Sequence, residues 1–270
     1  MPHLSRLIRS SSPGFTLIEA MVAMSLSSVI MLAAFGLVNI AQSNTTRTTE
    51  QTHVDQIARL AMEKTMEVLH SACIVPETTP IVEGSTSNKL KIISEEGDKA
   101  VFPSVHLNEI YYTASTHKLW DSEYKSEETA ESQYPNWKFP SKPEKTVLLA
   151  EHVEPAPVEP SEGSSGTQPI FRYYKYYRED TETHEYKDAG ELETEPLKGA
   201  AESAGLSKTE AQETSKVAVA FGVEPLNRKI KEAKNSKGER TFPATILRDS
   251  AVYRLTPAST QTGKPNEPCS

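Results

Sequence analysis

The chain has 270 residues, 24% of them charged, and its formal net charge is -8 at pH 7. This acidic balance disfavours a general nucleic-acid-binding surface, which needs clustered positive charge, so no nucleic-acid partner is expected. Aromatic residues make up 7% of the chain and there are 18 prolines, which favours a β-rich domain with long connections over a helical bundle.

Residues 1–14 form a short basic leader that contains Arg6 and Arg9 and no acidic residue. Because positively charged flanks of a membrane span tend to stay in the cytoplasm, the leader predicts a cytoplasmic N-terminus and a C-terminal domain across the membrane. Pro13 disfavours helix at the residue before it, and Gly14 has no Cβ. The leader is therefore expected to end in an accessible, non-helical segment.

A nearly unbroken apolar run follows, from Phe15 to Val38, and its single charge is Glu19. A helix over these 24 residues is about 36 Å long, enough to cross a bilayer core of about 30 Å. A lone carboxylate in such a span costs several kcal/mol unless it has a cationic partner. No other charge lies in the span. The nearest candidate on another chain is an amino terminus freed by a cut just before the apolar run.

The segment from Gly14 to Glu19 reads Gly-Phe-Thr-Leu-Ile-Glu and precedes the apolar helix directly. It resembles the class III signal of type IV prepilins and type II secretion pseudopilins. In that family a membrane aspartyl peptidase cuts after the glycine and N-methylates the new first residue, and the glutamate meets a neighbour's amino terminus during filament assembly. The resemblance covers residues 13 to about 45. It implies cleavage between Gly14 and Phe15, N-methylation of Phe15 and an assembly role for Glu19.

The same resemblance implies the partners and the location of the protein. The partners are the prepilin peptidase/N-methyltransferase, other pilins or pseudopilins, and inner-membrane lipid. The chain is expected to cross the bacterial inner membrane once, with its C-terminal domain in the periplasm, and to enter a filament on assembly. Two alternatives fit less well. A conventional secretory signal has a shorter apolar core and a small-x-small cleavage site, and an uncut signal anchor leaves Glu19 without a partner.

The next segment predicts an amphipathic continuation of the helix. The stretch from Gln42 to His53 is polar and rich in threonine, so a break or fraying is possible there. Beyond it, mostly apolar residues recur at alternating steps of four and three, which indicates one apolar stripe along a helix. The stripe consists of Val54, Ala58, Ala61, Thr65, Val68 and Ala72, joined by Ile57 and Leu69. The resemblance implies one long helix whose outer half, residues 39–73, is packed by a β-sheet. A coiled coil is the weaker alternative, because the stripe runs under three heptads.

Residues 74–270 are expected to form an extracytoplasmic, mostly antiparallel β domain, which makes the fold class α+β. The aromatic run 170–177 is expected to be a central strand with both faces partly covered, in which core packing is favoured over a binding face. Ser207 and Glu210 form a capping-box pattern for a short helix. Other expected strands cover 89–93, 109–113, 118–120, 145–150, 216–221 and 249–255, and loop insertions are expected near 121–145, 155–168 and 179–215.

The β domain shows no pattern that indicates catalysis. No pair of its histidines has the helical i,i+4 spacing that suits a metal, and the sequence has no phosphate-binding glycine loop and no nucleophile elbow. We therefore expect no enzyme activity, no catalytic residue, no metal and no cofactor. Cys73 and Cys269 allow one disulfide if the domain lies outside the cytoplasm, although their separation in sequence does not say whether they meet.

These observations predict a minor pilin or pseudopilin, a non-catalytic structural subunit that assembles into or caps a type IV pilus or a type II secretion pseudopilus. The size and the order of the strands loosely resemble minor subunits of the J or W type. The alternative is a membrane-tethered binding module, for adhesion or DNA-uptake recognition, that does not polymerise.

Overall fold

The computed structural model describes residues 14–72, 80–96, 104–127, 137–158, 166–176, 195–201, 204–226 and 244–253. The chain divides into two compact units, Met1–Thr49 and Glu50–Ser270. Its elements are α1 (Leu17–His70), β1 (Lys89–Glu96), β2 (Ser104–Thr113), β3 (Lys118–Lys125), β4 (Lys145–Ala150), β5 (Val153–Pro155), β6 (Phe171–Tyr174), the 3-10 helix η2 (Lys198–Ala201), α2 (Lys208–Glu213), β7 (Lys216–Val223) and β8 (Thr245–Val252). A long N-terminal helix with antiparallel sheets confirms the expected α+β class.

The described part of the first unit is almost entirely helical, and none of its residues is buried. The helix continues without a break through the polar stretch from Gln42 to His53. Threonine hydroxyls in this stretch donate to carbonyls one turn earlier, as from Thr45 to Ala41 at 2.9 Å and from Thr46 to Gln42 at 2.9 Å. These hydroxyls are therefore satisfied within the helix, and the low intrinsic propensity of threonine does not interrupt it here.

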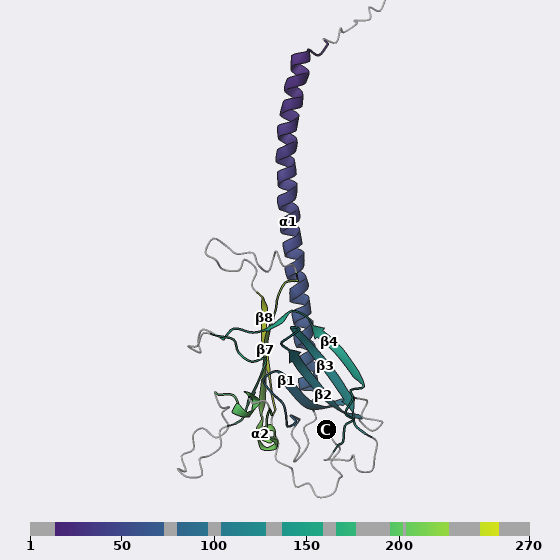
Figure 1. Cartoon of the computed structure of the whole chain (residues 1–270), viewed down its shortest axis with the longest axis vertical. Helices are drawn as coiled ribbons and strands as arrows, with labels where there is room; N and C mark the ends of the chain where they lie inside the picture. Colours follow the sequence, from purple (N-terminus) through teal and green to yellow (C-terminus); the bar gives the residue numbers. More distant parts are fainter. Residues whose placement is uncertain are drawn as a thin grey trace, which may run out of the picture. The chain divides into compact units, whose positions relative to one another are not determined.

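One sheet of the second unit is an antiparallel meander in the order β1-β2-β3-β4 (Figure 1). The expected hairpin is confirmed, because Thr113 of β2 pairs with Lys118 of β3. Strand β3 extends to Lys125, which places its C-terminal part inside the segment predicted as a loop near 121–145. Strand β4 covers residues 145–150 as expected. The fold therefore places β4 last in this sheet among the described strands.

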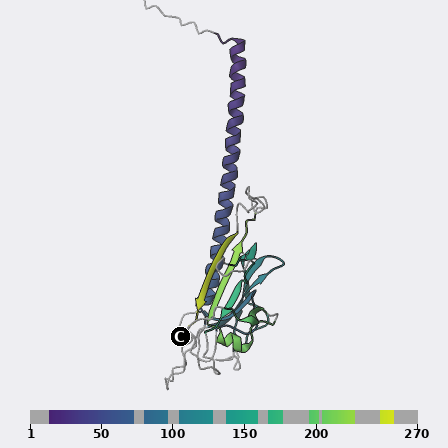
Figure 2. The same ribbon diagram turned by 90° about the vertical axis from the view of Figure 1, so that its left-hand side faces the viewer.

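The second sheet is built around β7. Strand β8 pairs with β7 along its whole length (Figure 2), and β5 and β6 pair with the other edge of β7. The expectation that the aromatic run 170–177 forms a central strand is therefore wrong: in the described chain, β6 has four residues and pairs with β7 alone. The small and β-branched side chains of β7 are buried on both faces, and this suits the central position.

The core of the second unit joins the outer part of α1 to both sheets. Most of the predicted stripe is buried, and Met62 and Met66 are buried beside it although the stripe did not include them. Tyr253, just after β8, donates its hydroxyl proton to the Leu69 carbonyl of α1 at 3.2 Å. Flexible methionine side chains fill irregular gaps, so their burial depends on the neighbouring sheets and not on helical periodicity.

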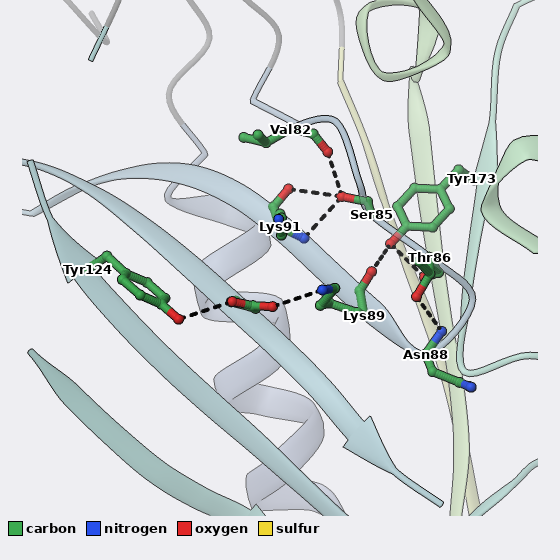
Figure 3. A network of polar contacts seen from close by, with 9 residues as sticks. Val82, Ser85, Thr86, Asn88, Lys89, Lys91, Tyr124 and Tyr173 are labelled. Atoms are coloured by element: carbon green, nitrogen blue, oxygen red, sulfur yellow. Dashed lines mark hydrogen bonds and ion pairs between the residues drawn. The ribbon is translucent and has the colours of Figure 1, made fainter. Parts of the chain in front are cut away.

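The two sheets are tied together by the hydroxyl of Tyr173 in β6. It donates toward the carbonyls of Thr86 at 3.2 Å and Lys89 at 2.9 Å (Figure 3). Burial raises the pKa of Tyr173 well above its ordinary value, which keeps the hydroxyl a neutral donor. Tyr173 and Tyr174 are both buried, so these two members of the aromatic run pack in the core, as the sequence favoured.

The short helix α2 confirms the predicted capping box. The Ser207 hydroxyl oxygen accepts a hydrogen bond from the Glu210 backbone N–H at 3.3 Å, and the Glu210 carboxylate accepts one from the Ser207 N–H at 2.9 Å. Several other expectations lie outside the described residues: the leader up to residue 13, the acidic loop over 179–194, and the possible disulfide between Cys73 and Cys269.

Candidate functional site

The candidate site is the first turn of α1, where a threonine caps the helix. The helix begins at Leu17, and the first intrahelical bond runs from the Ala20 N–H to the Thr16 carbonyl at 3.1 Å. The Thr16 side-chain oxygen accepts a hydrogen bond from the Glu19 backbone N–H at 3.3 Å. Thr16 is therefore the N-cap, and Glu19 is the third helical residue.

The same cap holds the carboxylate of Glu19 near the start of the helix. The Thr16 hydroxyl donates toward Glu19 Oε2 over 3.5 Å, a long hydrogen bond on an exposed surface. A carboxylate in the first turn is favoured by the positive end of the helix dipole. The local sequence therefore fixes an anionic group within one turn of the point where the helix begins.

The peptide bond between Gly14 and Phe15 lies outside the helix. Both residues are exposed, and a Cβ built on Gly14 meets no heavy atom within 4 Å. Among the described residues nothing covers this bond, which is the condition that a protease needs. A cut here creates an ammonium group on Phe15, so the arrangement places a potential new cation next to the turn that carries Glu19.

The helix that follows the cap has the length and composition of a membrane span. It is the one candidate span among the described residues, and the most apolar window of the helix contains no buried residue. Its serines donate to carbonyls of the preceding turn, as from Ser27 to Ala23 at 2.7 Å. Every polar hydroxyl of this kind is satisfied inside the helix, as an apolar environment requires. An apolar helix of this kind near the N-terminus suggests membrane anchoring.

The structure brings Gly14, Phe15 and Glu19 together at one end of α1, as the sequence predicts. Sequence reasoning missed Thr16, although the signal was present: Thr-x-x-Glu before an apolar run is a capping-box pattern. Outside this turn, no group of three or more histidine, cysteine, aspartate or glutamate residues that could hold a metal ion occurs in the described parts of the chain.

Comparison with known families finds a match at the N-terminus. Residues 9–35 match the family described as the prokaryotic N-terminal methylation motif. Comparisons with curated proteins and with solved structures give no match. The matched residues include the whole candidate site, so the chain carries a type IV pilin-like prepilin signal. This motif implies processing by a prepilin peptidase and assembly with pilins in general, and proteins that carry it are generally structural.

Proposed function

We propose that the chain is a minor pilin or pseudopilin that is cut after Gly14, N-methylated on Phe15 and assembled into a filament through Glu19. The observation that carries this proposal is the prepilin motif over residues 9–35, at the point where α1 begins. The β domain would remain a non-catalytic part of the subunit. We place the N-terminus of the chain in the cytoplasm and its C-terminal domain in the periplasm, because the leader is basic.

The assembly step is the pairing of two opposite charges that lipid disfavours. After cleavage, the Phe15 ammonium of one chain meets the Glu19 carboxylate of its neighbour, and the pair fixes the axial register of the two helices. The Thr16 hydroxyl orients that carboxylate before the partner arrives. Support comes from the apolar half of α1, because its exposed side chains find no cover in the described chain.

The size of the second unit favours a position at the tip of a filament. A shaft requires every copy to fit beside identical neighbours, and a domain with insertions as long as the expected 179–215 segment makes that packing harder. A tip subunit has neighbours on one side alone. We therefore propose capping over incorporation along the shaft.

Mass spectrometry of the N-terminus tests processing. Membrane fractions from cells with the peptidase should contain a chain that begins at methylated Phe15. An intact leader would overturn the proposal and leave a membrane-tethered binding module.

Variants of α1 test assembly separately from processing. Glu19→Ala should be cut normally and should fail to enter filaments. Glu63→Ala is the matched control, because this exposed carboxylate lies on the same helix beyond the span and should assemble normally. Normal assembly of the Glu19→Ala variant would contradict the role given to that carboxylate.

A further inference from the structure

A cavity of about 420 Å³ lies in the second unit between α1 and the sheet β1–β4. Its lining combines apolar with polar and charged side chains, and three polar side chains from neighbouring strands, Ser94, Asn108 and Asp121, form its floor. The apolar walls include Leu60, Ala61, Val68, Val147, Leu148 and Leu149. A cavity of this size with a few convergent polar groups has the composition of a binding site.

The three floor residues form a hydrogen-bonded chain, and each is more than nine-tenths buried. The Ser94 hydroxyl donates to Asn108 Oδ1 at 2.5 Å, and Asn108 Nδ2 donates to Asp121 Oδ1 at 3.3 Å. The serine bond fixes which end of the amide faces the carboxylate. Among the described residues, this long bond is the one hydrogen bond that Asp121 receives, which leaves its other oxygen available to a ligand.

The carboxylate of Asp121 lacks sufficient compensating charge. Burial raises its pKa above the ordinary value, and the opposing effects of the Asn108 hydrogen bond and of the Lys64 and Lys145 ammonium groups do not offset it. Lys64 also pairs with Glu67 at 2.7 Å. The other two carboxylates of the lining, on Glu67 and Glu123, contact Lys64 and His106, so Asp121 is the lining carboxylate that a further cation would suit best.

The cavity opens beside the free edge of the sheet. Strand β4 is last in the order β1-β2-β3-β4, and the described residues include no strand paired to its other edge. The side chains of Val147 and Leu148 are 38% and 37% exposed. An exposed edge strand with apolar side chains is a template for an added strand.

The pairing register of β3 and β4 places this free edge close to the buried carboxylate of Asp121. Val147 lies opposite Asp121, so both side chains are on the cavity face of the sheet. A residue on a strand added beside Val147 would share that face and lie two strand spacings, about 10 Å, from Asp121. Lysine and arginine have long apolar stems with a terminal charge, so either can cross Val147 and reach the carboxylate.

We propose that β4 accepts an extended segment of a partner protein, and that a lysine or arginine of this segment binds Asp121 in the cavity. The added strand supplies backbone hydrogen bonds to the free edge, and the basic side chain supplies the specificity. This inference goes beyond the proposed filament function and does not depend on cleavage at Gly14 or on Glu19.

Two matched synthetic peptides test the role of the basic side chain. Their binding to the full chain is measured in detergent micelles. Each is an alternating threonine–valine peptide, about nine residues long, with lysine or norleucine at its centre. Norleucine keeps the apolar stem and removes the charge. We expect the lysine peptide to bind about tenfold more tightly in fluorescence anisotropy, because a charge-assisted bond forms.

The Asp121→Asn variant should abolish the preference for lysine, since it keeps the shape of the side chain and removes the charge. Glu123→Gln is the matched control: it removes a charge from the same strand face, but that carboxylate already contacts His106 at 2.6 Å, so the preference should survive. A preference that persists in Asp121→Asn, or is lost equally in Glu123→Gln, would overturn the proposal.

Hydrogen exchange on the wild-type chain keeps the test independent of variant folding. The lysine peptide should protect backbone amides of β4 and leave those of β8, the edge strand of the other sheet, unchanged. Protection confined to any other element would refute strand addition. Binding of n-butylammonium without binding of the lysine peptide would also refute it, because a small amine alone would then be the ligand.

Discussion

The two units of the chain differ in what determines their structure. In the first unit, every hydrogen bond described is local to one helix, and no residue is buried by the rest of the chain. In the second, strands distant in sequence pair in fixed registers around a shared core. The apolar side chains of the first unit therefore find no cover in the described chain, whereas the structure of the second unit is specified by its own contacts.

The largest expected effect comes from removing core volume in the second unit. Leu69 is fully buried, and Leu69→Ala should lower the free energy of unfolding by about 3–5 kcal/mol, because it leaves a cavity. Urea unfolding followed by tryptophan fluorescence measures this, since Trp120 and Trp137 both lie in the second unit. Leu37→Ala, an exposed position in the first unit, should leave the urea midpoint unchanged.

Arginine substitutions at two similarly exposed leucines test whether the two units have different surroundings. Leu32 is 74% exposed and Leu60 is 66% exposed, so the chain alone does not distinguish them. Leu32→Arg should weaken membrane insertion by about 3 kcal/mol, because arginine is costly at the centre of a span. Alkaline extraction should then release more of this variant than of Leu60→Arg. Equal release of the two variants would contradict the membrane environment assigned to the first unit.

A smaller effect tests the connection between the two sheets. Tyr173→Phe removes the hydroxyl that joins β6 to the carbonyls of Thr86 and Lys89, and the loss should cost about 1–2 kcal/mol of unfolding free energy. Tyr111→Phe is the control, because among the described residues its hydroxyl makes no hydrogen bond. An equal loss of stability in both variants would contradict a specific contribution from the Tyr173 hydroxyl.

The smallest effect is a pH dependence that originates at Asp121. Its pKa is raised in the folded chain, so the folded state binds more protons than the unfolded state between the two pKa values. This contribution to stability is present at low pH and is lost as the pH rises from the unfolded value of about 3.9 through the folded value. Asp121→Asn should lack this loss. Parallel pH profiles of the urea midpoint for the wild-type chain and the variant would contradict the raised pKa.

Structural features that depend on residues close in sequence could be predicted, whereas strand pairing between distant residues could not. The Ser207 capping box and the hairpin at Thr113 and Lys118 both follow from neighbours within a few positions. The central position of β7 depends on pairing with β8, more than twenty residues later in the chain, and no residue pattern encodes that choice.

The cavity floor is the clearest case of a feature hidden from the sequence. Ser94, Asn108 and Asp121 come from three strands and meet because two separate registers align them. In the sequence, each of these polar residues is equally compatible with a solvent-exposed position. The continuity of α1 followed from the family resemblance and not from helix propensity, because the threonine-rich stretch from Gln42 to His53 has low propensity and is nevertheless helical.

The pairing of β7 with β8 has a consequence for the order in which the domain matures. Strand β8 and Tyr253 come last among the described residues, yet they complete one edge of the second sheet and contact Leu69, 184 positions earlier. During synthesis, the nascent chain must therefore keep β7 without this neighbour until β8 has emerged. The interval exposes an incomplete sheet edge, and this makes premature termination near residue 244 a route to aggregation.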